Sequence, residues 1–260
     1  MSESSAPRAV TEGAVLYEQR GPILLITLNR PDALNAVNPD IADGMSRAVA
    51  HLDGDSELRV GVLTGAGRAF CAGMDLKAYS RGENIDKFMT FLVHGSRKPI
   101  IAAIEGLAFA GGLEIALSCD IIVAARDAQL GIPETKVGLF AAGGGLMRLS
   151  KRVGYSKSME MAMTGEPISG EEAKSLGLAS RAVEKGTAVD EALSIAERIA
   201  MNAPLAVVAS KQLIQAAGRL TEDEYWTVQE SIVTSVFASN DATEGPVAFA
   251  EKRRPKWTGT

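Results

Sequence analysis

Hydrophobic and polar residues along the first half of this 260-residue chain predict strands separated by helices. Short apolar runs rich in branched side chains predict strands at residues 15–19, 23–28, 60–63, 100–104 and 121–125. Apolar positions at helical spacing predict helices at residues 40–52, 84–93 and 111–117. Strands that recur with helices between them are typical of parallel pairing through crossover connections.

The second half reads differently, because from Gly143 onward the pattern is almost wholly helical. No internal repeat and no low-complexity linker separates the two halves. Helical segments are expected to begin near Gly143, Tyr155, Ser169, Thr187, Pro204, Thr221 and Ala242. The pattern therefore predicts an α/β fold in which a mixed core, residues 1–200, is followed by a helical region, residues 201–260.

The amino-acid composition mainly excludes some classes of partner and site. Hydrophobic residues make up 46% and charged residues 23%, a balance typical of globular proteins. The 27 Lys and Arg against 32 Asp and Glu give a net charge of -5, which argues against a nucleic-acid partner. The two cysteines and two histidines are too few for a disulfide framework or a zinc site.

Targeting signals are not evident either. Residues Met1 to Val10 are polar, with Arg8 as the one basic side chain, so they resemble neither a secretory signal nor a transit peptide. Charged residues and paired glycines interrupt the apolar region from Ile100 to Ala125, so we expect no bilayer-spanning helix of about 20 residues and no membrane partner. A cytoplasmic location is expected, or a matrix location after removal of a transit segment.

Several glycine motifs in the chain bear on ligand binding. Gly65-Ala66-Gly67 follows a predicted strand, but Phe70 stands where a dinucleotide-binding turn has its third glycine. Neither a phosphate-binding P-loop motif nor a G-x-S-x-G motif occurs. The Gly143-Gly144-Gly145 triplet opens a helix, and both a flexible helix entry and a close approach to a ligand remain open.

Two glutamates are the candidate proton-transfer groups. Glu114 lies in the first turn of a predicted helix, among apolar residues that should raise its pKa by desolvation. The free N–H groups at such a helix start can face a developing oxyanion. Glu134 follows Pro133 after another apolar segment. The alternative for either glutamate is a helix cap or a partner of the helix dipole.

Ordered motifs over nearly the whole chain resemble the crotonase superfamily, the enoyl-CoA hydratase and isomerase fold. They run from Leu28-Asn29-Arg30-Pro31 to the tail that begins at Glu244-Gly245-Pro246. Between these lie Ala69-Phe70-Cys71-Ala72-Gly73-Met74-Asp75-Leu76, Lys98-Pro99-Ile100, Ala110-Gly111-Gly112-Leu113-Glu114, Cys119-Asp120, Pro133-Glu134 and Thr164-Gly165.

The resemblance implies a spiral of ββα units and an oxyanion hole formed by the backbone N–H groups of Met74 and Gly111. It places the two catalytic carboxylates of the hydratases on Glu114 and Glu134. Which glutamate holds which proton stays open at this point. Isomerases of the family generally keep one working carboxylate, so the presence of both favours hydration of a 2-enoyl-CoA, in fatty-acid or related acyl-CoA catabolism.

The resemblance also implies an acyl-CoA substrate and no metal or separate cofactor, since coenzyme A is part of the substrate. It implies a homotrimer or a hexamer, assembled through the C-terminal region. The CoA-binding positions it implies are Asn35, Ala36, Ala72, Asp75, Leu76, Lys77, Phe249 and Lys252. For each lysine, an ordinary solvated side chain is the alternative.

Two departures from the family pattern bear on specificity. Ala110 replaces a glycine that often precedes Gly111, a change expected to be tolerated if the backbone φ is negative. The segment from Gly138 to Gly143 lacks the proline common in typical hydratases. The tail also looks like that of carnitinyl-CoA dehydratases. A dehydratase, an isomerase, and an inactive relative that binds RNA or serves in assembly therefore remain as alternatives.

Overall fold

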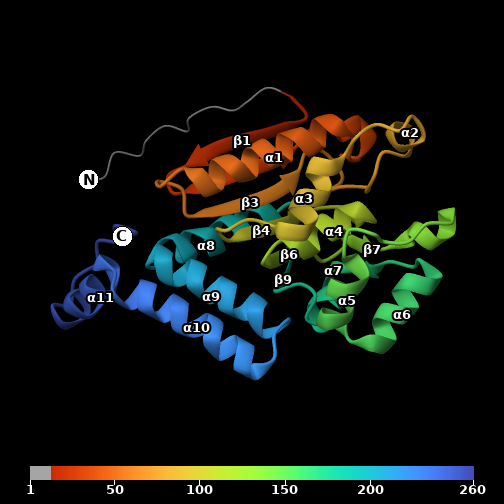
Figure 1. Ribbon diagram of the computed structural model, residues 1–260. Helices are drawn as coiled ribbons and strands as arrows, with labels where there is room; N and C mark the ends of the chain where they lie inside the picture. The colour runs from red at the N-terminus through yellow and green to blue at the C-terminus, as the bar shows by residue number, and fades with distance from the viewer. Residues whose placement is uncertain (1–12) are drawn as a thin grey trace.

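The computed structural model describes residues 13–260, so the expectation for Met1–Val10 lies outside the described residues. Within this range the strands form a six-stranded sheet in the order β1-β2-β3-β4-β6-β9 and a three-stranded sheet in the order β5-β7-β8 (Figure 1). The strands are β1 Val15–Arg20, β2 Ile23–Leu28, β3 Val60–Gly65, β4 Ile100–Ile104, β5 Leu107–Phe109, β6 Ile121–Ala125, β7 Gln129–Gly131, β8 Ile168–Ser169 and β9 Arg181–Val183.

The larger sheet has the parallel pairing that the sequence pattern predicts. β1 and β2 form an antiparallel hairpin around Gly21, whose φ of 58° suits a tight turn. From β2 onward each neighbouring pair in this sheet is parallel. The central strands β3 and β4 are buried almost throughout, as expected of a sheet covered on both faces.

Helices cover both faces of the larger sheet (Figure 1). On one face α8 packs against β3, β4 and β6 through a small apolar cluster that includes Val62, Ile101 and Ala192. On the other face the main core includes residues of α1, α3 and α4. The helical segments are η1 Pro31–Ala33, α1 Pro39–Gly54, α2 Leu76–Ser80, α3 Asp86–His94, α4 Gly111–Ser118, η2 Pro133–Val137, α5 Gly145–Val153, α6 Tyr155–Thr164, α7 Gly170–Ser175, α8 Ala188–Ala200, α9 Pro204–Ala217, α10 Glu222–Phe237 and α11 Asn240–Ala250.

Most of the predicted elements are present with small shifts in their ends. The prediction of an almost wholly helical second half was wrong in detail, because β8 and β9 lie within it. These strands have two and three residues, too short for a period to register. Gly65-Ala66-Gly67 is not followed directly by a helix, which confirms that it is no dinucleotide-binding turn.

The last three helices, α9 to α11, extend along one side and end of the molecule (Figure 1). No residue of α10 is buried, and Trp226 and Phe237 on it are exposed. Among residues 13–260 no single helix is long and apolar enough to cross a bilayer. The bent pair α8 and α9, at 112°, passes that test of length and composition when the two are taken together.

Candidate active site

Two adjacent parallel strands bring the two predicted glutamates to one place. β5 pairs in parallel with β7, so the carboxyl ends of both strands lie at the same edge. From that edge β5 leads through Ala110 into α4, which carries Glu114 in its first turn. β7 leads through Ile132 into η2, which carries Glu134. The two carboxylates lie close enough that the charge of Glu114 raises the pKa of Glu134.

Glu114 is buried, with 5% of its surface exposed, and its carboxylate lies against the glycine triplet. Its Oε1 accepts a hydrogen bond of 2.9 Å from the N–H of Gly145. Burial raises the pKa of Glu114, as the sequence predicted. Hydrogen bonds from the backbone of Gly145 and Gly143 and the positive charge of Arg148 lower it, in that order. Glu114 is therefore the better stabilised of the two as a carboxylate.

Glu134 has a different environment at the start of η2. Its Oε2 is a buried side-chain atom with no hydrogen-bond partner among the described residues. Burial raises the pKa of Glu134 to about 7, with a smaller contribution from the charge of Glu114. A carboxyl group with this pKa can hold or release a proton near neutrality. The unpartnered oxygen is free to meet a substrate atom.

The two predicted oxyanion donors also lie side by side. Cys71 pairs in parallel with Ala108 of β5. Met74 lies three residues after Cys71, and Gly111 lies three residues after Ala108, so the two donors remain in register. A Cβ built on Gly111 would be 3.6 Å from the Met74 nitrogen. The bridge between Val37 and Met74 uses the carbonyl of Gly73 and the N–H of Asp75, so the Met74 N–H faces the other way.

Ala110, the residue before Gly111, corrects one expectation. Its φ is 51° and its ψ is -126°, whereas the sequence argument required a negative φ for an alanine here. Ala110 is the one residue between the end of β5 and the first residue of α4, so the change of direction between strand and helix occurs at this position. The alanine therefore occupies a strained backbone position that glycine adopts at lower cost.

The segment predicted to contact CoA is tied together by Arg30, a residue that sequence reasoning did not single out as a site residue. Its guanidinium donates to the carbonyl of Ala36 at 2.5 Å and pairs with Asp75 at 3.1 Å. Asp75 also caps α2 by accepting from the backbone of Lys77 and Ala78. Arg30 therefore holds the two predicted CoA-binding loops next to each other.

The individual predicted CoA contacts divide into two groups. Ala36, Ala72 and Leu76 lie along the loops that Arg30 joins, and Lys77 is exposed beside them. The Asn35 side chain is fully buried and donates to the carbonyls of Ala66 and Ala69, so its amide serves the fold. Each of these positions stays a prediction as a CoA contact.

The structure does not bring Phe249 and Lys252 to the other site residues. Both belong to the C-terminal segment, on and just after α11, which lies at the opposite end of the molecule from α2 (Figure 1). Phe249 is 88% exposed. Within one chain these two residues therefore contribute nothing to the site around Glu114.

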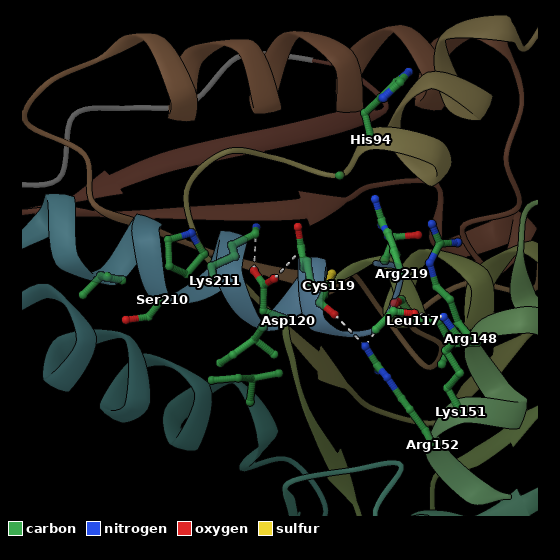
Figure 2. Close-up of a pocket in the computed structure, with 18 of the residues that line it drawn as sticks. His94, Leu117, Cys119, Asp120, Arg148, Lys151, Arg152, Ser210, Lys211 and Arg219 are labelled. Carbon is green, nitrogen blue, oxygen red and sulfur yellow. Dashed lines mark hydrogen bonds and ion pairs between the residues drawn. The ribbon is translucent and has the colours of Figure 1, made fainter. Parts of the chain in front are cut away.

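A cavity of 880 Å³ lies between the C-terminal end of α4, α5 and α9, away from the two glutamates. Neither Glu114 nor Glu134 lines it. Arg148, Lys151, Arg152 and Arg219 line one side of it, whereas Lys211 lines the other side and pairs with Asp120 at 2.8 Å (Figure 2). The cavity is therefore separate from the two glutamates, although Arg148 lines it.

The sequence of the chain matches the model of the enoyl-CoA hydratase/isomerase family over residues 18–260. It is 41% identical over 253 residues to the enoyl-CoA hydratase EchA19 of Mycobacterium tuberculosis, covering 93% of this chain and 95% of the relative. It is also 41% identical over 254 residues to a carnitinyl-CoA dehydratase of Proteus mirabilis, covering 92% and 96%.

Solved structures of enoyl-CoA hydratases have the same fold as this chain. The crystal structure of an enoyl-CoA hydratase from Mycobacterium tuberculosis H37Rv superposes with a TM-score of 0.92 at 51% identity, covering 96% of this chain and all of the other. The fold and site define a protein of the crotonase class. This chain belongs to the enoyl-CoA hydratase/isomerase family.

Proposed function

We propose that the protein is an enoyl-CoA hydratase, a hydro-lyase that adds water reversibly across the 2,3 double bond of a 2-enoyl-CoA. The observation that carries this proposal is the pair of carboxylates in unlike environments. Glu114 accepts a backbone hydrogen bond, whereas Glu134 has an unpartnered oxygen and a pKa of about 7. Hydration needs one group that takes a proton from water and one that gives a proton to carbon.

The proton assignment follows from these environments. Ionised Glu114 takes a proton from water as the water oxygen bonds to Cβ of the substrate. The double-bond electrons move toward the thioester, whose oxygen becomes enolate-like beside the N–H groups of Met74 and Gly111. Each well-placed donor of this kind is worth about 3 kcal/mol. Protonated Glu134 then delivers its proton to Cα, which gives the 3-hydroxyacyl-CoA. Proton exchange with solvent resets the pair.

The substrate itself supplies the coenzyme A, and we infer that the reaction uses no metal or redox cofactor. In the steps above the two carboxylates transfer the protons, and the two backbone amides stabilise the negative charge on the thioester oxygen. The described residues contain no group of three or more His, Cys, Asp or Glu side chains that could hold a metal ion. We also infer that the loops joined by Arg30 bind the CoA portion, with Lys77 as a phosphate partner.

We also infer that the protein forms a homotrimer or a dimer of trimers in which neighbouring copies contact the C-terminal region. In the single chain α10 packs against α9 and α11 but has no buried residue, and Trp226 and Phe237 on it are exposed. A neighbouring copy covering α10 and α11 removes this apolar surface from water. In such an assembly Phe249 and Lys252 are free to reach the CoA of another subunit.

A second candidate is the dehydration of a substituted 3-hydroxyacyl-CoA of the carnitinyl type. It is favoured by the 41% identity to the carnitinyl-CoA dehydratase of Proteus mirabilis. Dehydration is the reverse of hydration and uses the same carboxylates, so the site geometry is common to both. We infer that substrate preference then rests on residues 138–143, the segment that departs from the pattern of typical hydratases.

A thioester product screen tests the proposal. Purified protein is incubated with crotonyl-CoA, a longer 2-enoyl-CoA, a 3-enoyl-CoA and carnitinyl-CoA. The products are separated by chromatography against standards of each double-bond isomer and identified by mass spectrometry. A gain of one water on the 2-enoyl substrates supports the hydratase. Preferential loss of water from carnitinyl-CoA favours the second candidate. A shifted double bond without water addition, or no turnover of any thioester, contradicts hydration as the function.

A further inference from the structure

The Gly143-Gly144-Gly145 triplet lies between two charged side chains on opposite sides of it. A Cβ built on Gly143 would be 2.8 Å from Glu114 Oε2, and one built on Gly145 would be 2.9 Å from Glu114 Oε1. A Cβ built on Gly144 would be 2.6 Å from Arg148 Nη1. The triplet is thus a thin layer of backbone with the Glu114 carboxylate on one side and the Arg148 guanidinium on the other.

The guanidinium of Arg148 fixes this layer in place. Its Nη1 donates to the carbonyl of Gly143 at 2.9 Å. Its Nη2 donates to the carbonyl of Leu92 in the last turn of α3. The same carbonyl also accepts from the Ser118 hydroxyl of α4 at 3.4 Å. One planar side chain on α5 therefore links the glycine layer to the end of α3.

No ion pair of Arg148 occurs within residues 13–260, so carbonyl oxygens alone accept its hydrogen bonds there. The charged groups that act on the Glu114 region are Arg148 from α5 and Glu134 from η2. Arg219, beyond α9, acts in turn on Arg148, and these two guanidinium groups lie on the same side of the cavity (Figure 2). The positive charge of Arg148 is thus uncompensated by a paired carboxylate and acts on Glu114.

We propose that Arg148 is a positioning residue for Glu114, which it serves by clamping the Gly143–Gly145 backbone against α3 and by placing a positive charge behind the carboxylate. The inference rests on the proposed hydratase function, because it assigns Arg148 a part in keeping Glu114 aimed and ionised. Arg148 donates to the carbonyls of Gly143 and Leu92 and makes no direct hydrogen bond to Glu114. It acts through the N–H of Gly145, which contacts Glu114 directly.

Arg152, about one turn further along α5, supplies a matched control. Its Nη2 donates to the carbonyls of Leu117 and Cys119 at 3.1 Å, so it too joins α5 to a helix end. The charges that act on Arg152 are those of Cys119, Asp120 and Arg148, and Arg152 is not among the charges that act on Glu114. Removal of either arginine should lower thermal stability. Only the removal of Arg148 should change the position and the pKa of the Glu114 carboxylate.

The test compares Arg148→Met, Arg148→Lys and Arg152→Met with the wild type in crotonyl-CoA hydration across a pH series. Loss of the positive charge raises the pKa of Glu114, and the reaction needs its ionised form. The ascending limb of kcat in Arg148→Met therefore moves to higher pH, and kcat falls about 10- to 100-fold while KM stays within about twofold. Arg148→Lys keeps the positive charge but cannot donate to both carbonyls with the geometry of a guanidinium. The ascending limb of its kcat profile should therefore stay near the wild-type pH, with a kcat between those of Arg148→Met and the wild type.

Arg152→Met should lower the melting temperature with kcat and the pH limb unchanged. A wild-type kcat and pH profile in Arg148→Met, or the same limb shift in Arg152→Met, would overturn the proposal. If Arg148→Met fails to fold, Arg148→Gln provides a neutral variant that keeps an amide donor for one carbonyl.

A second measurement separates this inference from the proposed function. Carbon-13 NMR of labelled glutamate carboxyl groups, assigned with Glu114→Gln, follows the titration of Glu114 in the resting protein without substrate. A higher pKa of Glu114 in Arg148→Met than in the wild type supports the charge effect even if no thioester is hydrated. Equal titration curves in the two proteins refute it whatever the product screen shows.

Discussion

Glu114 Oε1 accepts a 2.9 Å hydrogen bond from the N–H of Gly145, 31 residues further along the chain. The contact joins the first turn of α4 to the first residue of α5 and fixes one oxygen of the carboxylate. Because a Cβ on Gly145 would lie 2.9 Å from both Cγ and Oε1 of Glu114, glycine at this position is a requirement of the site.

Gly145→Ala should therefore displace the Glu114 carboxylate. A shift of about 1 Å in a catalytic group can lower kcat by about 10²-fold, and we expect a loss of that order. Steady-state kinetics with crotonyl-CoA measures it. Gly54→Ala is the control, because Gly54 ends α1 and a Cβ there meets nothing within 4 Å. Wild-type kcat in Gly145→Ala would show that the carboxylate tolerates displacement.

Removal of either carboxylate tests the proton-transfer steps directly. Glu114→Gln should abolish the base and Glu134→Gln the acid, and each should lower kcat by about 10²-fold or more. Because the two groups act as a unit on the same substrate, the double variant should lose little more than each single variant. Glu184→Gln, at an exposed carboxylate paired with Arg126, serves as the control and should keep wild-type turnover. Normal rates in both single variants would remove the mechanism.

The raised pKa of Glu134 also predicts how stability depends on pH. Its folded-state pKa of about 7 exceeds the ordinary value of 4.5, so the folded state holds this proton more tightly than the unfolded state. The stabilisation from the bound proton is complete below about pH 4.5 and is lost as the pH rises through 7. Glutamine carries no such proton.

Thermal unfolding of the wild type and Glu134→Gln should therefore diverge between pH 4.5 and 7, the two pKa values given above. We expect the variant to gain melting temperature relative to the wild type across that window and to hold the gain at pH 8. Glu184→Gln should show no comparable divergence. Parallel curves for Glu134→Gln and the wild type would mean that the carboxyl group titrates near its ordinary value.

Sequence reasoning singled out Glu114 and Glu134 as the candidate proton-transfer pair, and the structure explains why their proximity was harder to predict. Glu114 and Glu134 were identifiable from apolar surroundings and from the family motifs. They meet because β5 and β7 pair in parallel, and each of these strands has three residues. A run of three residues is too short to show an alternating pattern, so the periodicity of the chain did not reveal this pairing.

Two other features depended on backbone geometry rather than residue type. The positive φ of Ala110 contradicted the expectation for alanine, because the sharp reversal before α4 overrides its local preference. For the glycine triplet the sequence left both a flexible helix entry and a close approach to a ligand open, whereas its packing between Glu114 and Arg148 follows from tertiary contacts between α4 and α5. An arginine within an amphipathic helix gave no sign of this role.

The strain at Ala110 leads to a prediction of its own. Ala110→Gly should relieve a conformation that is costly for an alanine, and we expect a gain of about 1 kcal/mol in the free energy of unfolding. Chemical denaturation measures the gain. Ala206→Gly, at an exposed position within α9, should have the opposite sign and lose about 0.5–1 kcal/mol. A loss of stability in Ala110→Gly would show that the alanine methyl group packs well enough to offset the strain.

The exposed C-terminal helices give the last prediction, which concerns assembly. Phe237 is 76% exposed and Phe249 is 88% exposed, and α10 has no buried residue in the single chain. If neighbouring copies cover this surface, an introduced charge should be buried without a partner and should weaken the assembly strongly. Light scattering coupled to size exclusion should give a mass of three or six chains for the wild type and a lower mass for Phe237→Asp.

Thr227→Asp, at an exposed polar position of α10, should keep the wild-type mass if Thr227 lies outside the contact. A monomeric wild type, or an unchanged mass in both Phe237→Asp and Phe249→Asp, would show that these helices do not hold the copies together.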